Sequence, residues 1–459
     1  MKKLFNLLLD GRNMNAENEV MFVRSQSQLA VDNPAAKGQR LTYSQAIRTF
    51  GDDVVKKVLE DGVVSLVPSY HEPAMTIKKK REQLGFELDH IVKFTHLKLQ
   101  LVADAETPGK VVSIQDLNDI CQVLALDESV LGFKPSSGSD DALGVRLRML
   151  TENRDAKAFS ASTVAKLVEA AWVIAKQANL SEILNRKVHY LATLQHKQDD
   201  DYSYPTFEKG YLLAEKTRHL LGIDDDTPIP SVRALIEETL NIPLIQTELD
   251  IRFAGATIAN GTYRGIVVNE NGRNADVAVR RMTTCHELAH LLWDSDEKLN
   301  RLLVDEYESI ENAHHVTDVV EMRANSFAVA FLAPRAGVIK IFRNNKTIKS
   351  VIEKVSEKYG ISVLASRYHV RNICKCETNF ISVDNVDFQN WKAAENLTID
   401  IVPGLDKEVP ISRRGMFSGI VAKAYLERNI SEDTASMFLK SNRKLTPETA
   451  KNLSSLWKI

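Results

Sequence analysis

The chain has 459 residues, of which 44% are hydrophobic and 26% are charged, and a length of this order accommodates about three domains with their own cores. Its formal net charge of −2 gives no general attraction to nucleic acid or to an anionic membrane, and its four cysteines are too few for a disulfide scaffold. No apolar run reaches the roughly 18 residues of a membrane span and no signal-peptide pattern opens the chain, so we expect a soluble, cytoplasmic protein without membrane contacts.

Five regions follow one another along the chain, separated by changes in pattern and by turn-forming residues. The first, residues 1–73, mixes short helical pieces with a polar stretch and carries no motif that indicates chemistry. The others are a compact helical domain at 75–133, a helical connector at 142–200, a region with a metal-site motif at 205–375, and a C-terminal α/β or helical domain at 380–459. We expect a multidomain α+β protein, mostly α with a small antiparallel sheet.

The pattern of residues 75–133 is typical of a small bundle of helices. A first helix over Ile77–Leu84 ends at Gly85, a second begins near Glu87, and Ser113–Asp127 predicts a closing helix. This order resembles the Cro or phage-repressor (XRE) type of helix-turn-helix domain. The resemblance implies DNA binding and a role in transcription regulation.

The segment in which a recognition helix would lie departs from that type. Lys98 and Gln100 are its only good candidates for base contacts, whereas Asp104 and Glu106 repel phosphate. Residues 76–133 carry seven bases and nine acids, while DNA-binding domains are usually basic on their docking face. DNA binding through Lys98 and Gln100 therefore competes with a second interpretation, a helical bundle that contacts protein.

The strongest chemical signal is the pentapeptide His286-Glu287-Leu288-Ala289-His290, which lies inside a segment with helical spacing of apolar residues. Residues four apart share one face of a helix, so both imidazoles can reach one metal ion. Zinc accepts His ligands and in catalytic sites keeps one position for water, from which Glu287 is placed to accept a proton. Before this helix, Tyr263–Val268 predicts an edge strand, to which an extended substrate could add.

A catalytic zinc site needs a third protein ligand, and the sequence offers several. Asp296 would serve in an H-E-x-x-H-x-x-G-x-x-D pattern, but Trp293 stands where that pattern needs glycine. His314 and His315 are adjacent, so only one of them could bind. Glu321 opens a second predicted helix, whose small residues allow close packing on the first. Glu321 is the third ligand that we favour.

Together, the two helical segments resemble the ImmA/IrrE family of zinc metallopeptidases over about residues 205–375. The resemblance rests on the run from His286 to Leu292 and on the later segment from Glu321 to Pro334. The Zn²⁺ ligands that it implies are His286, His290 and Glu321. It implies that Glu287 is the general acid and base. It also implies limited proteolysis in stress, prophage or phage-defence control.

Three functions remain open. The leading hypothesis is a zinc-dependent metallopeptidase that makes limited cuts in a regulatory partner protein such as a transcriptional repressor. The alternative from a different class is a DNA-binding transcriptional regulator whose zinc domain is a sensor or scaffold without proteolytic turnover. A third interpretation is a component of a phage-defence or prophage switch that acts by binding a partner protein. A homodimer is compatible with all three.

Overall fold

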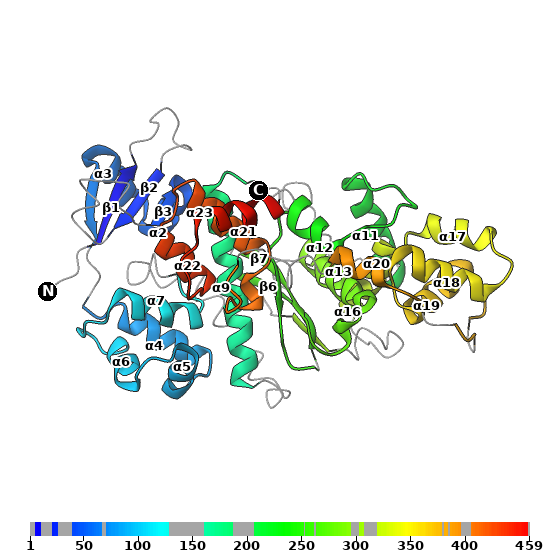
Figure 1. The fold of residues 1–459 in the computed structure, drawn as a ribbon, viewed down its shortest axis with the longest axis horizontal. Coiled ribbons are helices and arrows are strands. Elements are labelled where there is room, and N and C mark those ends of the chain that lie inside the picture. The colour runs from blue at the N-terminus through cyan, green and yellow to red at the C-terminus, as the bar shows by residue number, and fades with distance from the viewer. Residues whose placement is uncertain are drawn as a thin grey trace. The chain divides into compact units, whose positions relative to one another are not determined.

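The structure is a computed structural model, which divides the chain into two compact units (Figure 1). The first comprises Met1–Lys187, Ala259–Tyr263 and Val402–Ile459, and the second comprises Val188–Ile258 and Arg264–Ile401. The second unit therefore lies in sequence between the two long segments of the first, and the short segment Ala259–Tyr263 of the first unit interrupts it. The residues described are 5–10, 21–25, 39–66, 70–127, 160–186, 206–251, 253–260, 263–294, 303–306, 319–378, 381–383, 386–395 and 405–457.

The first unit begins with a four-stranded antiparallel sheet in the order β3-β2-β1-β4. Its strands are β1 (Phe5–Asp10), β2 (Met21–Ser25), β3 (Gln39–Thr42) and β4 (Val63–Leu66). Helices α2 (Tyr43–Phe50) and α3 (Asp52–Asp61) lie between β3 and β4. The sequence predicted helical pieces here but missed the sheet, because each strand is short and β1 pairs with β4, far along the chain.

A group of helices covers the region for which a helix-turn-helix was expected. The helices are α4 (Ala74–Gln83), α5 (Leu88–Thr95), α6 (Leu99–Ala105) and α7 (Ile114–Val123). The left-handed backbone of Gly85, with φ of 68°, follows α4 as the sequence predicted. The Arg81 Nε atom lies 2.6 Å from Glu106 Oε1, so the Glu106 carboxylate is neutralised within the bundle.

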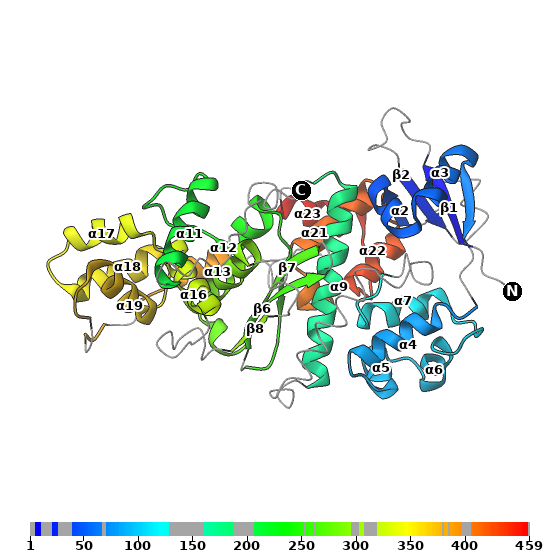
Figure 2. The same cartoon turned by 180° about the vertical axis from the view of Figure 1, so that it is seen from behind.

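The long helix α9 (Ala161–Ile183) packs beside the C-terminal helix α21 (Met416–Leu426) in the first unit (Figure 2). The helices α22 (Glu432–Leu439) and α23 (Pro447–Leu456) follow. Threonine before proline in the sequence predicts the start of the last helix, and Thr446 indeed caps α23, with Pro447 as its first residue. Fully buried Arg413 joins three segments that are remote in sequence. It donates to Glu169 Oε1 of α9 at 3.3 Å, to Gln122 Oε1 of α7 at 3.1 Å and to the Phe438 carbonyl of α22 at 2.7 Å.

The second unit is built around a mixed sheet with the strand order β5-β7-β6-β8. The strands are β5 (Leu244–Thr247), β6 (Phe253–Asn260), β7 (Tyr263–Asn269) and β8 (Leu303–Glu306). Two expectations are wrong here. The sheet is not purely antiparallel, because β5 pairs with β7 in the parallel direction. For the same reason β7 is an inner strand, so a substrate cannot add to it.

The helices of the second unit pack mainly against one another. They are α11 (Thr206–Leu220), α12 (Val232–Ala234) with its continuation η4 (Leu235–Thr239), α13 (Val277–Trp293), α16 (Val319–Leu332), α17 (Arg335–Arg343), α18 (Ile348–Tyr359), α19 (Val363–Cys374) and α20 (Gln389–Glu395). Helix α16 packs against both α11 and α13. A Cβ on Gly210 of α11 would lie 2.4 Å from the Arg323 carbonyl of α16, so only glycine allows this approach.

Two expectations for the remaining segments can be compared with the structure. The sequence of residues 380–383 is typical of a strand, but residues 381–383 have no regular secondary structure. Residues 134–141, whose Pro, Ser and Gly content predicts a linker, lie outside the described residues. Among the helices that the structure describes, no single one has the length and apolar composition to cross a membrane. The pair α16 and α17, bent by 58°, passes that test jointly.

His369 of α19 is a fully enclosed histidine in the second unit. Its Nδ1 atom lies 3.0 Å from the Tyr211 hydroxyl oxygen and its Nε2 atom 2.7 Å from the Ala333 carbonyl oxygen. Burial lowers the pKa of His369 to about 4, because a charged imidazole would lose its hydration. The folded state therefore keeps the neutral ring at pH values where the unfolded chain already binds a proton.

We expect this difference to appear in the pH dependence of stability. Because the pKa of His369 is lower in the folded state, protons bind preferentially to the unfolded chain below pH 6.5. The free energy of unfolding should therefore be highest above pH 6.5 and fall by about 3 kcal/mol as the pH falls toward 4. Urea unfolding of wild type and of His369→Gln at several pH values measures this decrease. The variant should lose less stability over this window, whereas substitution of exposed His219 by glutamine should not change the slope. Equal slopes for wild type and His369→Gln would contradict the prediction.

Candidate active site

Helix α13 carries the three residues of the sequence motif. The Asp276 side chain caps its N-terminus by accepting a hydrogen bond from the Ala278 amide at 2.8 Å. Neither glycine nor proline interrupts the helix, so His286 and His290 lie one turn apart on the same face. Both imidazoles and the Glu287 side chain between them are completely buried.

Helix α16 brings Glu321 to the two histidines. The Nε2 atoms of His286 and His290 lie 2.9 Å apart. Glu321 Oε2 is 3.2 Å from His286 Nε2, and Glu321 Oε1 is 3.4 Å from His290 Nε2. The three side chains thus direct one nitrogen or oxygen each to a common point, with all of these atoms within 4.8 Å of one another.

The outward-facing nitrogen of each imidazole has its own partner. His286 Nδ1 lies 2.9 Å from Asn325 Oδ1, and His290 Nδ1 lies 2.9 Å from Asp294 Oδ2. Arg323 of α16 in turn donates to the buried Asp294 carboxylate. An Nδ1–H that donates to oxygen leaves the Nε2 lone pair free to bind a metal, so these contacts select the tautomer that a metal site requires.

Glu287 points toward the sheet. The Thr257 hydroxyl of β6 donates to Glu287 Oε2 at 2.6 Å and lies 3.1 Å from the Glu287 carbonyl oxygen. Gly255, two residues earlier on β6, leaves room for this carboxylate: a Cβ there would lie 3.1 Å from Glu287 Oε1. The geometry therefore holds a buried carboxylate beside a cluster of metal-ligating groups, the arrangement that metal-assisted hydrolysis needs.

Comparison with known families identifies this part of the chain. Residues 249–371 match the family model described as IrrE N-terminal-like domain, Peptidase_M78. The chain contains a peptidase-type domain. This IrrE N-terminal-like domain includes β6, β7, α13 and α16, and it occupies about a quarter of the chain. No curated protein was found to match the chain.

The electrostatics of the IrrE N-terminal-like domain favour positive charge at the common point. Burial lowers the pKa of His290, but hydrogen bonds to Asp294 and Glu321 outweigh it and raise that pKa to about 10. Burial raises the pKa of Glu321, but the hydrogen bonds from His286 and His290 hold it well below its usual range. The same groups would stabilise a divalent cation, because it would place positive charge between them.

Gly255 sets the space for Glu287, so its replacement has a predictable effect. In Gly255→Ala the new Cβ would lie 2.8 Å from the Val267 carbonyl oxygen, a backbone atom that cannot rotate away. We expect β6 and the Glu287 carboxylate to shift, which should lower any activity that depends on this carboxylate on the order of 10²-fold. Measured metal content should stay as in wild type, because the histidines are not touched. An unchanged activity would contradict this role of Gly255.

The remaining predicted site residues lie elsewhere. The alternative ligands Asp296, His314 and His315 fall outside the described residues. Lys98 and Gln100 are exposed at the start of α6 in the first unit, and Gln100 Nε2 donates to Asp104 Oδ1 at 3.0 Å. This internal bond uses the amide that was expected to read a base, and DNA binding through these two residues stays a prediction.

Several residues of the site had no role in the sequence prediction. Asp294 and Asn325 each follow a predicted ligand by four positions, so their place on the same helical face was readable from spacing. Arg323 could not be assigned in this way, because it reaches Asp294 from another helix. Thr257 and Gly255 come from a strand, and no local signal connects them with Glu287.

Proposed function

We propose that the IrrE N-terminal-like domain is a zinc-dependent peptidase that makes limited cuts in a regulatory partner protein. In this proposal His286, His290 and Glu321 hold the zinc ion, and Glu287 is the general acid and base. The observation that carries the proposal is the convergence of two imidazole Nε2 atoms and one carboxylate within 4.8 Å, beside a buried glutamate.

The donor set supports zinc as the metal. Two His nitrogens and one Glu oxygen form a set that catalytic zinc sites use, with a fourth position for water or substrate. Asn325 and Asp294 support it further, because partners on the second nitrogen of each imidazole fix the ring orientation that a metal ligand needs. When bound, zinc supplies a Lewis acid that polarises the scissile carbonyl and lowers the pKa of water.

The chain's own residues supply the proton transfers. Glu287 would take a proton from the attacking water and deliver it to the leaving amine. The hydrogen bond from Thr257 fixes Glu287 Oε2 and so orients the other carboxylate oxygen for proton transfer. The surrounding fold excludes bulk water, since both histidines and Glu287 are fully enclosed, and this strengthens each electrostatic contact.

The enclosure of the site also supports a narrow choice of substrate. With the three motif residues at 0% exposure and the Glu321 side chain at 14%, a compact protein surface cannot reach the reacting groups. Only an extended segment of a docked partner fits this restriction, which favours limited cleavage over digestion. We therefore propose a regulatory protein such as a transcriptional repressor as the substrate.

Metal content tests the proposal directly. Elemental analysis of purified protein, after addition and removal of excess zinc, should give about one zinc per chain, as one His₂Glu site requires. His290→Ala and Glu321→Ala should both lose it, whereas replacement of exposed His219 by alanine should keep it. Wild type without zinc would refute the metallopeptidase proposal. Zinc retained in Glu321→Ala would refute Glu321 as the third ligand.

A further inference from the structure

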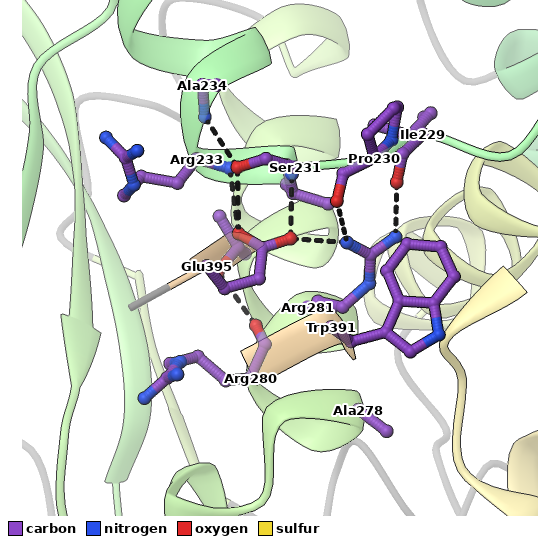
Figure 3. A network of polar contacts seen from close by, with 12 residues as sticks. Ile229, Pro230, Ser231, Arg233, Ala234, Ala278, Arg280, Arg281, Trp391 and Glu395 are labelled. Carbon is purple, nitrogen blue, oxygen red and sulfur yellow. Dashed lines mark hydrogen bonds and ion pairs between the residues drawn. The ribbon is translucent and has the colours of Figure 1, made fainter. Parts of the chain in front are cut away.

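A buried acidic side chain from α20 reaches the base of the candidate catalytic helix (Figure 3). Glu395 accepts hydrogen bonds from the backbone amides of Val232 at 2.8 Å and Arg233 at 3.2 Å. It also pairs with Arg281 of α13, and only 1% of the Arg281 side chain and 6% of the Glu395 side chain are exposed. The carboxylate thus ties together three segments: α20, the start of α12 and α13.

Arg281 extends this connection to two more backbone positions. Its Nη2 atom donates to the Ile229 carbonyl at 2.7 Å and to the Tyr359 carbonyl at 3.4 Å. The guanidinium is therefore held on several sides, and Arg281 joins α13 to Ile229, to Tyr359 and to Glu395 of α20. His286 follows five positions later, about 7.5 Å along the helix axis.

Trp391 covers the guanidinium from the side of α20. The Arg281 guanidinium carbon lies 4.2 Å from the centre of the Trp391 ring, and Figure 3 shows the ring beside it. Gly360 makes the contact possible, since a Cβ there would lie 2.7 Å from the ring. Trp391 Nε1 also donates to the Glu357 carbonyl at 3.0 Å. Trp391 and Glu395, four positions apart on α20, therefore both contact Arg281.

We propose that Glu395 is a positioning residue of the candidate peptidase, which fixes α13 through Arg281 and so fixes the two histidine ligands, about one and a half and two and a half turns further along the helix. Helix α20 begins 18 residues beyond the end of the family match at residue 371. The catalytic helix of this chain thus depends on an element outside the matched domain. That element directly precedes the segment that returns to the first unit at Val402. The expected effect of Glu395 on zinc affinity rests on the proposed function, whereas its expected effect on the stability of α13 does not.

Hydrogen–deuterium exchange of the metal-free full chain tests the effect on α13. In Glu395→Gln the amides of 282–293 should exchange faster than in wild type. Lys392→Ala, an exposed change on the same helix, should leave them unaltered. Faster exchange confined to 229–235 and 386–395 would overturn the proposal. An equal increase in α19 would also overturn it, because it would indicate general destabilisation.

Zinc competition with a chelator tests the effect on the ligands. We expect about ten- to a hundredfold weaker zinc binding in Glu395→Ala, as for other losses of support around metal ligands. Added acetate should restore affinity in this variant, because it can return a carboxylate to Arg281 and the two amides. Sodium chloride at the same ionic strength should not. Unchanged zinc affinity, or restoration by both salts alike, would overturn the positioning role. Wild type without zinc would refute the proposed function and leave the exchange experiment to decide.

Discussion

On the proposed function, replacement of Glu287 by glutamine should slow peptide cleavage severely without a loss of zinc binding. Glutamine fills the same buried space against β6 and can still accept the hydrogen bond from Thr257, so the fold should be preserved. It cannot accept the proton of the attacking water, and removal of such a base slows cleavage by about 10²- to 10⁴-fold. Cleavage of a defined peptide mixture or of a candidate repressor, followed by mass spectrometry, measures the loss.

Two further variants make this experiment specific. Thr257→Val removes only the hydrogen bond that orients Glu287, so a loss of about tenfold is expected, equivalent to roughly 1.4 kcal/mol. Glu248→Gln alters an exposed carboxylate of the same unit and should have no effect on cleavage. Full activity in Glu287→Gln would remove Glu287 from the reaction. Zinc binding without cleavage in wild type would instead favour the regulator whose zinc domain is a sensor.

Replacement of Arg413 by methionine should destabilise the first unit by about 3 kcal/mol, since it breaks a buried hydrogen-bonded ion pair. The change leaves the Phe438 carbonyl without its 2.7 Å donor and removes a cationic partner of Glu169. Neighbouring Arg413 and Lys440 hold the pKa of Glu169 at about 2 against the effect of burial, which indicates how strongly the site favours the charged pair. Urea unfolding of the full chain measures the change.

The matched control lies next in the sequence. Arg414 is less buried than Arg413, and it donates to the carbonyl groups of Val409 and Lys407, which are close to it in sequence, so Arg414→Met should cost far less. Hydrogen exchange should rise together in α7, α9 and α22 of Arg413→Met, because the side chain joins all three. Faster exchange limited to α22 would mean that these helices belong to separately folding parts.

The helical part of the candidate site was predictable from sequence because its geometry is local. A four-residue spacing places His286 and His290 on one face, and Glu321 was found as the opening residue of a second periodic segment. Asp294 and Asn325 follow the same spacing rule, so they could have been predicted as hydrogen-bond partners for the second nitrogen of each imidazole.

The rest depends on contacts that no local pattern encodes. β7 looked like an edge strand because its sequence does not reveal that β5 pairs on its other side. Thr257 and Gly255 contact Glu287 because β6 of the sheet packs against α13, which the local sequence does not reveal. The antiparallel sheet near the N-terminus and the inserted position of the second unit likewise arise from pairings between residues far apart in sequence.

The insertion has a consequence for synthesis on the ribosome. Arg413, which anchors α9, is translated about 230 residues after the end of that helix at Ile183, an interval of roughly 10–50 s at typical elongation rates. During that time all of the second unit is synthesised, whereas the apolar side of α9, with Leu167, Val168 and Trp172, still lacks its C-terminal partners. A nascent chain therefore exposes this apolar side of α9 until residues 405–457 have been made, and chaperones are expected to bind α9 first.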